Sequence, residues 1–199
     1  MPTSFRFAVK VPRAITHEAA LCSPRAALDV FFGDVRGLGS KLGPVLVQLP
    51  ASVLFQPRRV AAFFRTMRQL HGGDVVCEPR HESWYEPAAS AVFADYDIAR
   101  VQADPLRPAN ARAPDESSSL LYFRWHGSPR RYWSAYDDER LSRLTTQVTN
   151  SLVSRSTWCM FDNTASGAAA GNALRLAAML APRSKREGSA PLAPATAHG

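Results

Sequence analysis

Short apolar runs and amphipathic stretches alternate along the 199 residues, and this order limits the folds that the chain can adopt. Strands are expected from the apolar runs at 5–11, 45–49, 75–78, 98–103, 120–126 and 157–161. Helical spacing of apolar residues occupies the segments 24–42, 57–71, 87–94, 137–154 and 168–180. Strands that alternate with helices predict an α/β fold in which parallel strands are joined by crossover helices.

The strength of the pattern varies along the chain. The segment 57–71 is the clearest helix, because Pro57 suits a first turn and Gly72 with Gly73 ends the apolar stripe. In the segment 24–42, Gly33, Gly37 and Gly39 weaken the helical prediction. No Gly-x-Gly-x-x-Gly or phosphate-loop motif follows any strand, so a nucleotide-binding doubly wound sheet lacks its usual signature.

Two segments lack this alternation. Residues 106–119 are predicted to form a polar loop, and residues 182–199 to form a disordered, basic, Pro/Ala-rich tail after one domain at 1–181. No stretch approaches the roughly 18 apolar residues that span a bilayer, and Arg6 and Lys10 interrupt any signal-peptide core. We therefore expect a cytoplasmic protein with no membrane partner.

The net charge and the cysteine content indicate which partners the protein favours and in which redox compartment it works. The formal net charge of +7 favours anionic partners, namely phosphorylated metabolites, nucleic acid or an acidic protein, although a plain basic surface would give the same value. The three cysteines Cys22, Cys77 and Cys159 are odd in number and far apart in sequence. That distribution predicts reduced thiols in the cytoplasm and no zinc site.

Polar side chains stand where the predicted strands end. In parallel α/β proteins such strand ends meet at one rim, which is where sites are built. The expected rim residues are Lys10, Gln48, Glu78, Arg80, His81, Asp104, Arg124, His126, Asp162 and Asn163. Three cations, Lys10, Arg80 and Arg124, lie near few carboxylates, so the sequence predicts a pocket that favours anions.

Roles follow from the chemistry of these groups. His126 is the first candidate for acid–base catalysis, since His titrates near neutrality, and Glu78 is its expected partner. The remaining rim residues are expected to bind substrate, together with the nearby indole, and they are Lys10, Arg80, His81, Arg124, Asn163, Asp104, Gln48 and Trp84. No cofactor can be inferred.

Each assignment has a simpler alternative. Glu78 and Arg80 could form a structural ion pair, and Trp84 could be a packing residue. A divalent metal is the rival interpretation of the oxygen and nitrogen ligands Glu78, Asp104, His126 and Asp162. Against a metal, the neighbouring lysine and arginines would repel a cation.

Several short motifs at these predicted strand ends resemble motifs of the YecE-like family, known as domain of unknown function 72. The resemblance covers residues 5–180 and rests on five short motifs in order: 5–13 with 15–17; 42–50; Glu78, Arg80, His81, Ser83 and Trp84; Tyr122, Arg124, His126 and Gly127; and Phe161, Asn163, Gly167, Asn172 and Ala173. It implies a TIM-barrel-like (β/α) fold without a settled activity. Pro79, Glu82 and Asp162 depart from the family's pattern.

The resemblance also implies an incomplete barrel with about six of eight βα units, because Met1 would fall just before the family's third strand. An open arc of strands exposes two sheet edges, so we expect self-association. Three function classes remain: an enzyme acting on a phosphorylated or carboxylated molecule, a non-catalytic binder of anions or nucleic acid, and an inactive truncated paralogue. The sequence leaves open whether the protein is an enzyme.

Overall fold

Two parallel sheets form the framework of the molecule. The computed structural model describes residues 2–105, 118–151 and 155–181. The first sheet has the order β1-β2-β3-β4 and the second the order β5-β6-β7, with every pairing parallel. The strands are β1 (Phe7–Lys10), β2 (Leu42–Gln48), β3 (Val75–Glu78), β4 (Ile98–Arg100), β5 (Gln102–Asp104), β6 (Leu120–Trp125) and β7 (Ser156–Phe161). The predicted α/β fold with parallel strands is confirmed.

One predicted strand, 98–103, is shared between the two sheets. Its first half, β4, pairs with β3, and its second half, β5, pairs with β6. Between them the Val101 amide donates to the Cys77 carbonyl at 2.9 Å. The sheets therefore follow one another along a single curved row of strands.

No closed barrel is found among the described strands. β1 pairs only with β2 and β7 only with β6, so both are edge strands. The inner faces of the two sheets nevertheless meet in one apolar cluster, whose buried members are Leu46, Val76, Ala99, Val101, Leu120 and Tyr122. Trp158 of β7 reaches across this interior to β2, where Gly43 leaves room for the indole.

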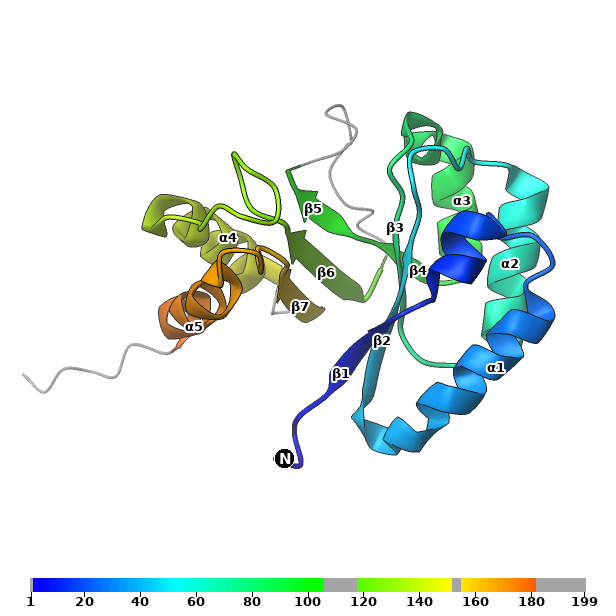
Figure 1. Cartoon of the computed structure of the whole chain (residues 1–199), viewed down its shortest axis with the longest axis horizontal. Coiled ribbons are helices and arrows are strands. Elements are labelled where there is room, and N and C mark those ends of the chain that lie inside the picture. The colour runs from blue at the N-terminus through cyan, green and yellow to red at the C-terminus, as the bar shows by residue number, and fades with distance from the viewer. Residues whose placement is uncertain (1, 106–117, 152–154, 182–199) are drawn as a thin grey trace, which may run out of the picture.

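Helices cover the outer face of each sheet (Figure 1). The first sheet is covered by α1 (Arg25–Val35), α2 (Pro57–Leu70) and α3 (Pro87–Asp95), and the second by α4 (Asp138–Ser151) and α5 (Ala168–Leu180). Short helical turns are η1 (Ala14–Glu18), η2 (Arg36–Lys41) and η3 (Glu82–Tyr85). The helix predicted at 24–42 is shorter than expected. The α-helix ends at Val35, a 3₁₀ turn follows, and the backbone leaves the helical conformation at Gly39, which has φ +49°.

The amphipathic stripe of α2 illustrates how sequence spacing becomes packing. Val60, Phe63, Phe64 and Met67 recur at helical intervals and are all buried against the first sheet. Around the second sheet, Leu144 and Leu176 from α4 and α5 bury a separate outer cluster. The two layers leave the strand ends on one side free to carry polar groups.

Within the described ranges, no helix has the length and apolar character that a membrane crossing requires. The predicted tail 182–199, most of the polar loop 106–119 and the last turn of the helix predicted to end at 154 lie outside the described residues.

Candidate functional site

The carboxyl ends of the strands bring the expected polar residues to one rim. Lys10, Gln48, Glu78 and Asp104 are the last residues of β1, β2, β3 and β5. Gln48 and Glu78 are register partners in adjacent strands, so their side chains start side by side. Arg124 lies one residue before the end of β6, and Asp162 follows β7 directly. The rim predicted from the sequence therefore exists.

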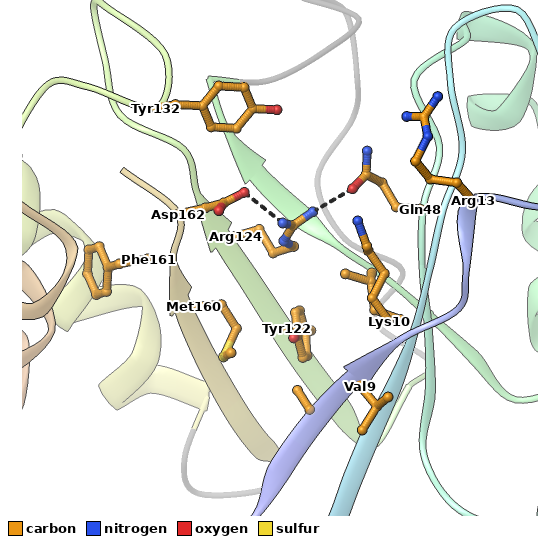
Figure 2. Close-up of a pocket in the computed structure, with 12 residues that line it drawn as sticks. Val9, Lys10, Arg13, Gln48, Tyr122, Arg124, Tyr132, Met160, Phe161 and Asp162 are labelled. Atoms are coloured by element: carbon orange, nitrogen blue, oxygen red, sulfur yellow. Dashed lines mark hydrogen bonds and ion pairs between the residues drawn. The ribbon is translucent and has the colours of Figure 1, made fainter. Parts of the chain in front are cut away.

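A cavity of about 450 Å³ opens between this rim and the inner apolar cluster. Its polar lining comes from Lys10, Arg13, Gln48, Arg124, Tyr132 and Asp162, as Figure 2 shows. Tyr122 and Met160, which belong to or pack against the inner apolar cluster, also line it. The cavity thus has a basic mouth and a partly apolar floor, and its size is in the range of small-molecule sites.

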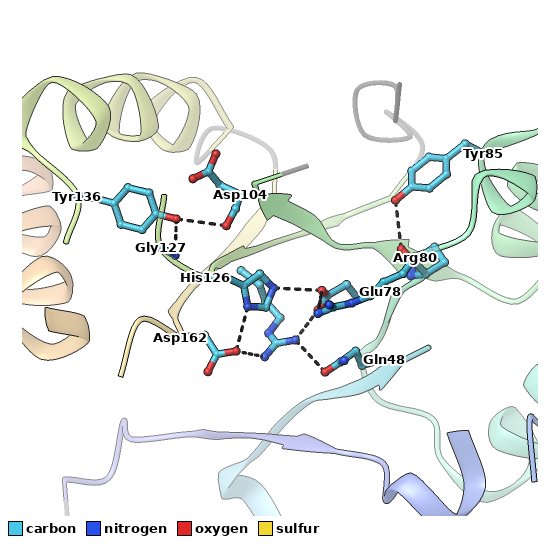
Figure 3. A network of polar contacts seen from close by, with 11 residues as sticks. Gln48, Glu78, Arg80, Tyr85, Asp104, His126, Gly127, Tyr136 and Asp162 are labelled. Atoms are coloured by element: carbon cyan, nitrogen blue, oxygen red, sulfur yellow. Dashed lines mark hydrogen bonds and ion pairs between the residues drawn. The ribbon is translucent and has the colours of Figure 1, made fainter. Parts of the chain in front are cut away.

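Arg124 links the cavity to a buried polar network. Figure 3 shows this network around Glu78, His126 and Asp162. Arg124 Nη1 donates to Gln48 Oε1 at 3.3 Å and to the carboxylate of Glu78. Its Nη2 donates to Asp162 Oδ2 at 2.7 Å. With contacts to both carboxylates, the guanidinium is held in one orientation at the cavity wall.

Glu78 is the buried centre of the network. Its Oε1 accepts a hydrogen bond from Arg80 Nη2 at 3.0 Å, and His126 Nε2 lies 3.1 Å from the same oxygen. Only 3% of Glu78 is exposed. Burial alone would raise the pKa of this carboxyl group, but the hydrogen bond from His126 and the charges of Arg124 and Arg80 outweigh burial and lower it to about 2. Glu78 is therefore ionised at neutral pH.

His126 joins the two carboxylates. Its Nδ1 lies 3.0 Å from Asp162 Oδ2, opposite the contact of Nε2 with Glu78. A neutral imidazole has a single N–H, so both contacts are donated hydrogen bonds only when both ring nitrogens carry protons. The ring is 1% exposed and lies beneath the cavity lining.

Asp162 is the carboxylate that reaches the cavity. Its side chain is 34% exposed and contacts both Arg124 and His126. Burial opposes ionisation, but the hydrogen bond from His126 and the charge of Arg124 hold the pKa of Asp162 below its usual value. A chain of contacts therefore runs from the cavity through Asp162 and His126 to Glu78.

Two basic side chains at the mouth are not neutralised in this way. Lys10 and Arg13 line the cavity, and neither has a hydrogen bond or ion pair with the residues that the structure describes. His17, on η1, lies near them. Burial, together with the charges of Arg13 and Lys10, lowers the pKa of His17, as expected beside a positive patch.

Three predicted substrate-binding residues have structural contacts instead. Trp84 is fully buried and its Nε1 donates to the Val53 carbonyl at 2.8 Å. Asn163 is also buried, with Nδ2 donating to Asn172 Oδ1 at 2.8 Å. His81 Nδ1 accepts from the Ser83 amide at 3.1 Å and caps η3. None of the three lines the cavity.

The other predicted residues divide into two groups. Lys10, Gln48 and Arg124 line the cavity, whereas Arg80 and Glu78 form the layer behind it. Asp104 ends β5 away from the lining, and its backbone carbonyl accepts a hydrogen bond from the Tyr136 hydroxyl at 3.2 Å (Figure 3).

The rival metal site has no geometric support in the described ranges. There, no group of three or more His, Cys, Asp or Glu side chains is placed to hold a metal ion. Glu78 and Asp162 contact arginine and histidine instead, which is the arrangement of a charge network.

Arg13 and Tyr132 line the cavity but were not among the predicted site residues. Arg13 follows the Pro12 that ends the first apolar run, so its place at a strand end was a usable signal. Tyr132 belongs to the loop after β6, where no spacing rule indicates which side chain turns back over the strands.

Solved structures show that this fold recurs in other proteins. A crystal structure of a DUF72 family protein from Thermotoga maritima MSB8 has a TM-score of 0.79 and 27% identity, covering 90% of this chain and 75% of that one. A DUF72 family protein from Enterococcus faecalis V583 has a TM-score of 0.75 and 24% identity, covering 90% of this chain and 80% of that one, and supports the fold alone. No curated protein matches the chain.

The sequence comparison agrees with the structural one. The model of the family described as "Protein of unknown function DUF72" matches residues 1–197, which is nearly the whole chain and includes every cavity residue. The protein belongs to the DUF72 family.

Proposed function

We propose that the protein binds a small phosphorylated or carboxylated molecule in the cavity at the carboxyl ends of its strands. The observation that carries this proposal is the pair Lys10 and Arg13, which line the cavity without a partner among the described residues. Arg124 adds a third cation that its carboxylate contacts hold in place. Charge-assisted hydrogen bonds from preoriented donors are the usual means of holding an anion.

The buried network supports this role by positioning Arg124. Glu78 and Asp162 contact the guanidinium from two sides, Arg80 adds a positive charge beside Glu78, and His126 contacts both carboxylates. Because both carboxylates are engaged, they do not cancel the charge of Lys10 or Arg13. The cavity mouth therefore keeps a positive potential.

An enzyme acting on the same ligand is the second candidate. It is favoured by the contacts from Asp162 through His126 to Glu78, which join a partly exposed carboxylate to a buried one. A proton on His126 Nδ1 can pass to Asp162 as Asp162 gives a proton to a ligand, and it can return in the reverse step, so the expected acid–base pair of His126 and Glu78 would act on a ligand through Asp162. A non-catalytic binder and an inactive paralogue remain the alternatives when no turnover occurs.

The fold proposal extends the observed architecture. The two sheets would represent about six βα units of an incomplete TIM-like barrel, with β1 and β7 as its open edges. This is supported by the parallel pairing throughout and by the single inner cluster that both sheets share. Self-association along these edges remains a prediction, and gel filtration of the chain would test it.

Calorimetric titration with inorganic phosphate, followed by citrate, tests the binding proposal. Lys10→Ala and Arg13→Ala should each weaken phosphate binding about tenfold or more, which corresponds to losing one charged hydrogen bond of about 1.5–3 kcal/mol. The matched control is Lys41→Ala, because Lys41 stands before β2 at the opposite end of the strands and donates to the Pro2 carbonyl at 3.0 Å. Absence of binding by both anions, or an equal loss in Lys41→Ala, would refute the proposal.

A further inference from the structure

The loop between β6 and α4 carries two consecutive exposed aromatic side chains, the first of which lines the cavity. Its residues 130–133 read Arg-Arg-Tyr-Trp. Tyr132 is 41% exposed and Trp133 is 46% exposed, so two neighbouring aromatic rings face solvent. Exposed aromatic rings in succession are costly unless something covers them, and they are typical of sites that recognise planar groups.

Hydrogen bonds from backbone groups and buried side chains hold this loop in place. The Gly127 amide donates to the Tyr136 hydroxyl at 2.8 Å, and the Tyr136 amide donates to Asn172 Oδ1 at 3.0 Å. Asn163 Nδ2 donates to the Ser134 carbonyl at 3.0 Å. These bonds use backbone groups and buried side chains. The Tyr132 ring also meets the His126 ring edge-on, with centroids 5.6 Å apart, and this contact leaves part of its surface, like that of Trp133, open to solvent.

Each ring is stacked with a guanidinium. The Arg130 guanidinium carbon lies 4.5 Å from the centroid of the Trp133 ring, and that of Arg131 lies 4.7 Å from the centroid of the Tyr132 ring. Stacked arginine and aromatic side chains bind bases through their flat faces and phosphates through their charge. The loop thus offers both properties in four consecutive residues.

Tyr132 connects this loop to the cationic cavity. Its ring lines the same cavity as Lys10, Arg13 and Arg124. Figure 2 shows the ring above Arg124, across the cavity from Arg13. The Tyr132 backbone has φ +63°, a conformation that a non-glycine residue rarely adopts. That conformation is accompanied by a bond from the Ala165 amide to the Tyr132 carbonyl at 3.0 Å, which fixes the residue at the cavity edge.

We infer that the anion bound in this cavity is the phosphate of a nucleotide, whose base stacks on the rings of Tyr132 and Trp133. The inference rests on the proposed anion site and specifies its ligand class. Lys10, Arg13 and Arg124 hold the phosphate, and the aromatic pair at the edge holds the planar base outside the cavity mouth. A free nucleotide and the phosphorylated end of a single-stranded nucleic acid carry this same chemistry.

The test compares ligands that carry the phosphate alone, the nucleoside alone, both together, or both within a single-stranded nucleic acid. Inorganic phosphate, adenosine, adenosine 5′-monophosphate and a 5′-phosphorylated eight-nucleotide oligodeoxyadenylate are titrated into the full chain by calorimetry. Adenosine 5′-monophosphate should bind about fivefold to 100-fold more tightly than phosphate, the range that one stacked base contributes. Trp133→Ala and Tyr132→Ala should each remove that gain. Trp133→Ala, whose ring does not line the cavity, should also leave the affinity for phosphate unchanged.

Two control variants test whether the loss comes from the stacked rings of this loop, and not from misfolding of the loop or from removing any exposed aromatic ring. Tyr132→Phe keeps the ring and should keep the gain, which separates stacking from any effect on loop folding. Phe5→Ala removes another exposed aromatic ring, 44% exposed, just before β1 at the other end of the strands, and should have no effect.

The outcomes separate this inference from the proposal beneath it. Phosphate binding without any gain from the base, or a gain that survives both alanine variants, would overturn the nucleotide inference and leave the anion site standing. Failure of both phosphate and nucleotide to bind would overturn both. A tighter, steeply salt-dependent affinity for the oligonucleotide assigns the ligand to nucleic acid, and equal affinities assign it to free nucleotides.

Discussion

Replacing Glu78 with glutamine tests whether the buried network stabilises the fold through its charge. The substitution keeps the shape of the side chain but removes the negative charge that contacts Arg80 and Arg124. It also removes the carboxylate that faces His126 Nε2. Arg80, Arg124 and His126 would then share a network in which Asp162 is the remaining carboxylate.

The expected magnitude follows from the pKa of Glu78. That pKa is lowered from 4.5 to about 2, a difference of about 2.5 pKa units. At about 1.36 kcal/mol per unit, ionised Glu78 contributes about 3 kcal/mol to the free energy of unfolding at neutral pH. Glu78→Gln should therefore lower the free energy of unfolding by about 3 kcal/mol, within the range known for breaking buried ion pairs.

The same reasoning predicts how the loss depends on pH. Because the folded-state pKa lies below the unfolded one, the contribution of Glu78 is complete above about pH 4.5 and is lost as the pH falls towards 2. Urea unfolding of both proteins at a series of pH values measures this. The difference between the wild-type protein and Glu78→Gln should be constant above pH 4.5 and should shrink below it.

Glu139→Gln is the matched control, because Glu139 forms an exposed ion pair with Arg143 on α4. Exposed pairs contribute little, so this variant should unfold like the wild-type protein. If Glu78→Gln were as stable as the wild-type protein, or if its deficit persisted unchanged down to pH 2, the charge network would not stabilise the fold as argued.

Two further predictions concern the interior. An alanine Cβ at Gly43 would lie 2.6 Å from Trp158 Cη2, so Gly43→Ala should destabilise the protein by about 1–3 kcal/mol in thermal unfolding. The exposed thiol of Cys22 should react with a thiol reagent in the native protein. Buried Cys77 should react only after unfolding and the partly buried Cys159 more slowly than Cys22, because burial raises the pKa of both thiols.

Each of these has a direct comparison. Gly33→Ala in α1 meets nothing within 4 Å, so it should be neutral or stabilising, since alanine is the better helix former. Equal effects of the alanine at 33 and at 43 would contradict the packing argument. Reaction of three thiols at one rate in the native protein would contradict the burial argument.

Much of the fold could be predicted because its signals are local. The strand Val75–Glu78 and the helix Ala168–Leu180 have the predicted bounds, since apolar periodicity and flanking glycine or proline define them within a few residues. The division of 98–103 between two sheets could not be predicted in this way. It depends on which neighbouring strand each half meets.

The candidate site also has a part that local sequence signals predict and a part that depends on tertiary packing. Strand ends alone placed Lys10 and Arg124 at the rim, because parallel strands carry their last residues to one side. Which face a side chain takes, and how deeply it is buried, depends on packing between distant segments. Trp84 could therefore be either a stacking platform or a core residue until its indole was seen against the Val53 carbonyl.

The order of strands and helices, the family and the polar residues at the carboxyl rim can be read from the sequence, because each depends on short stretches of chain. The position of His126 beneath the cavity between Glu78 and Asp162, and the positions of Arg13 and Tyr132 in the cavity lining, come from tertiary packing. His126 pairs with side chains 36 and 48 residues away in sequence, and no local pattern records which distant residues meet.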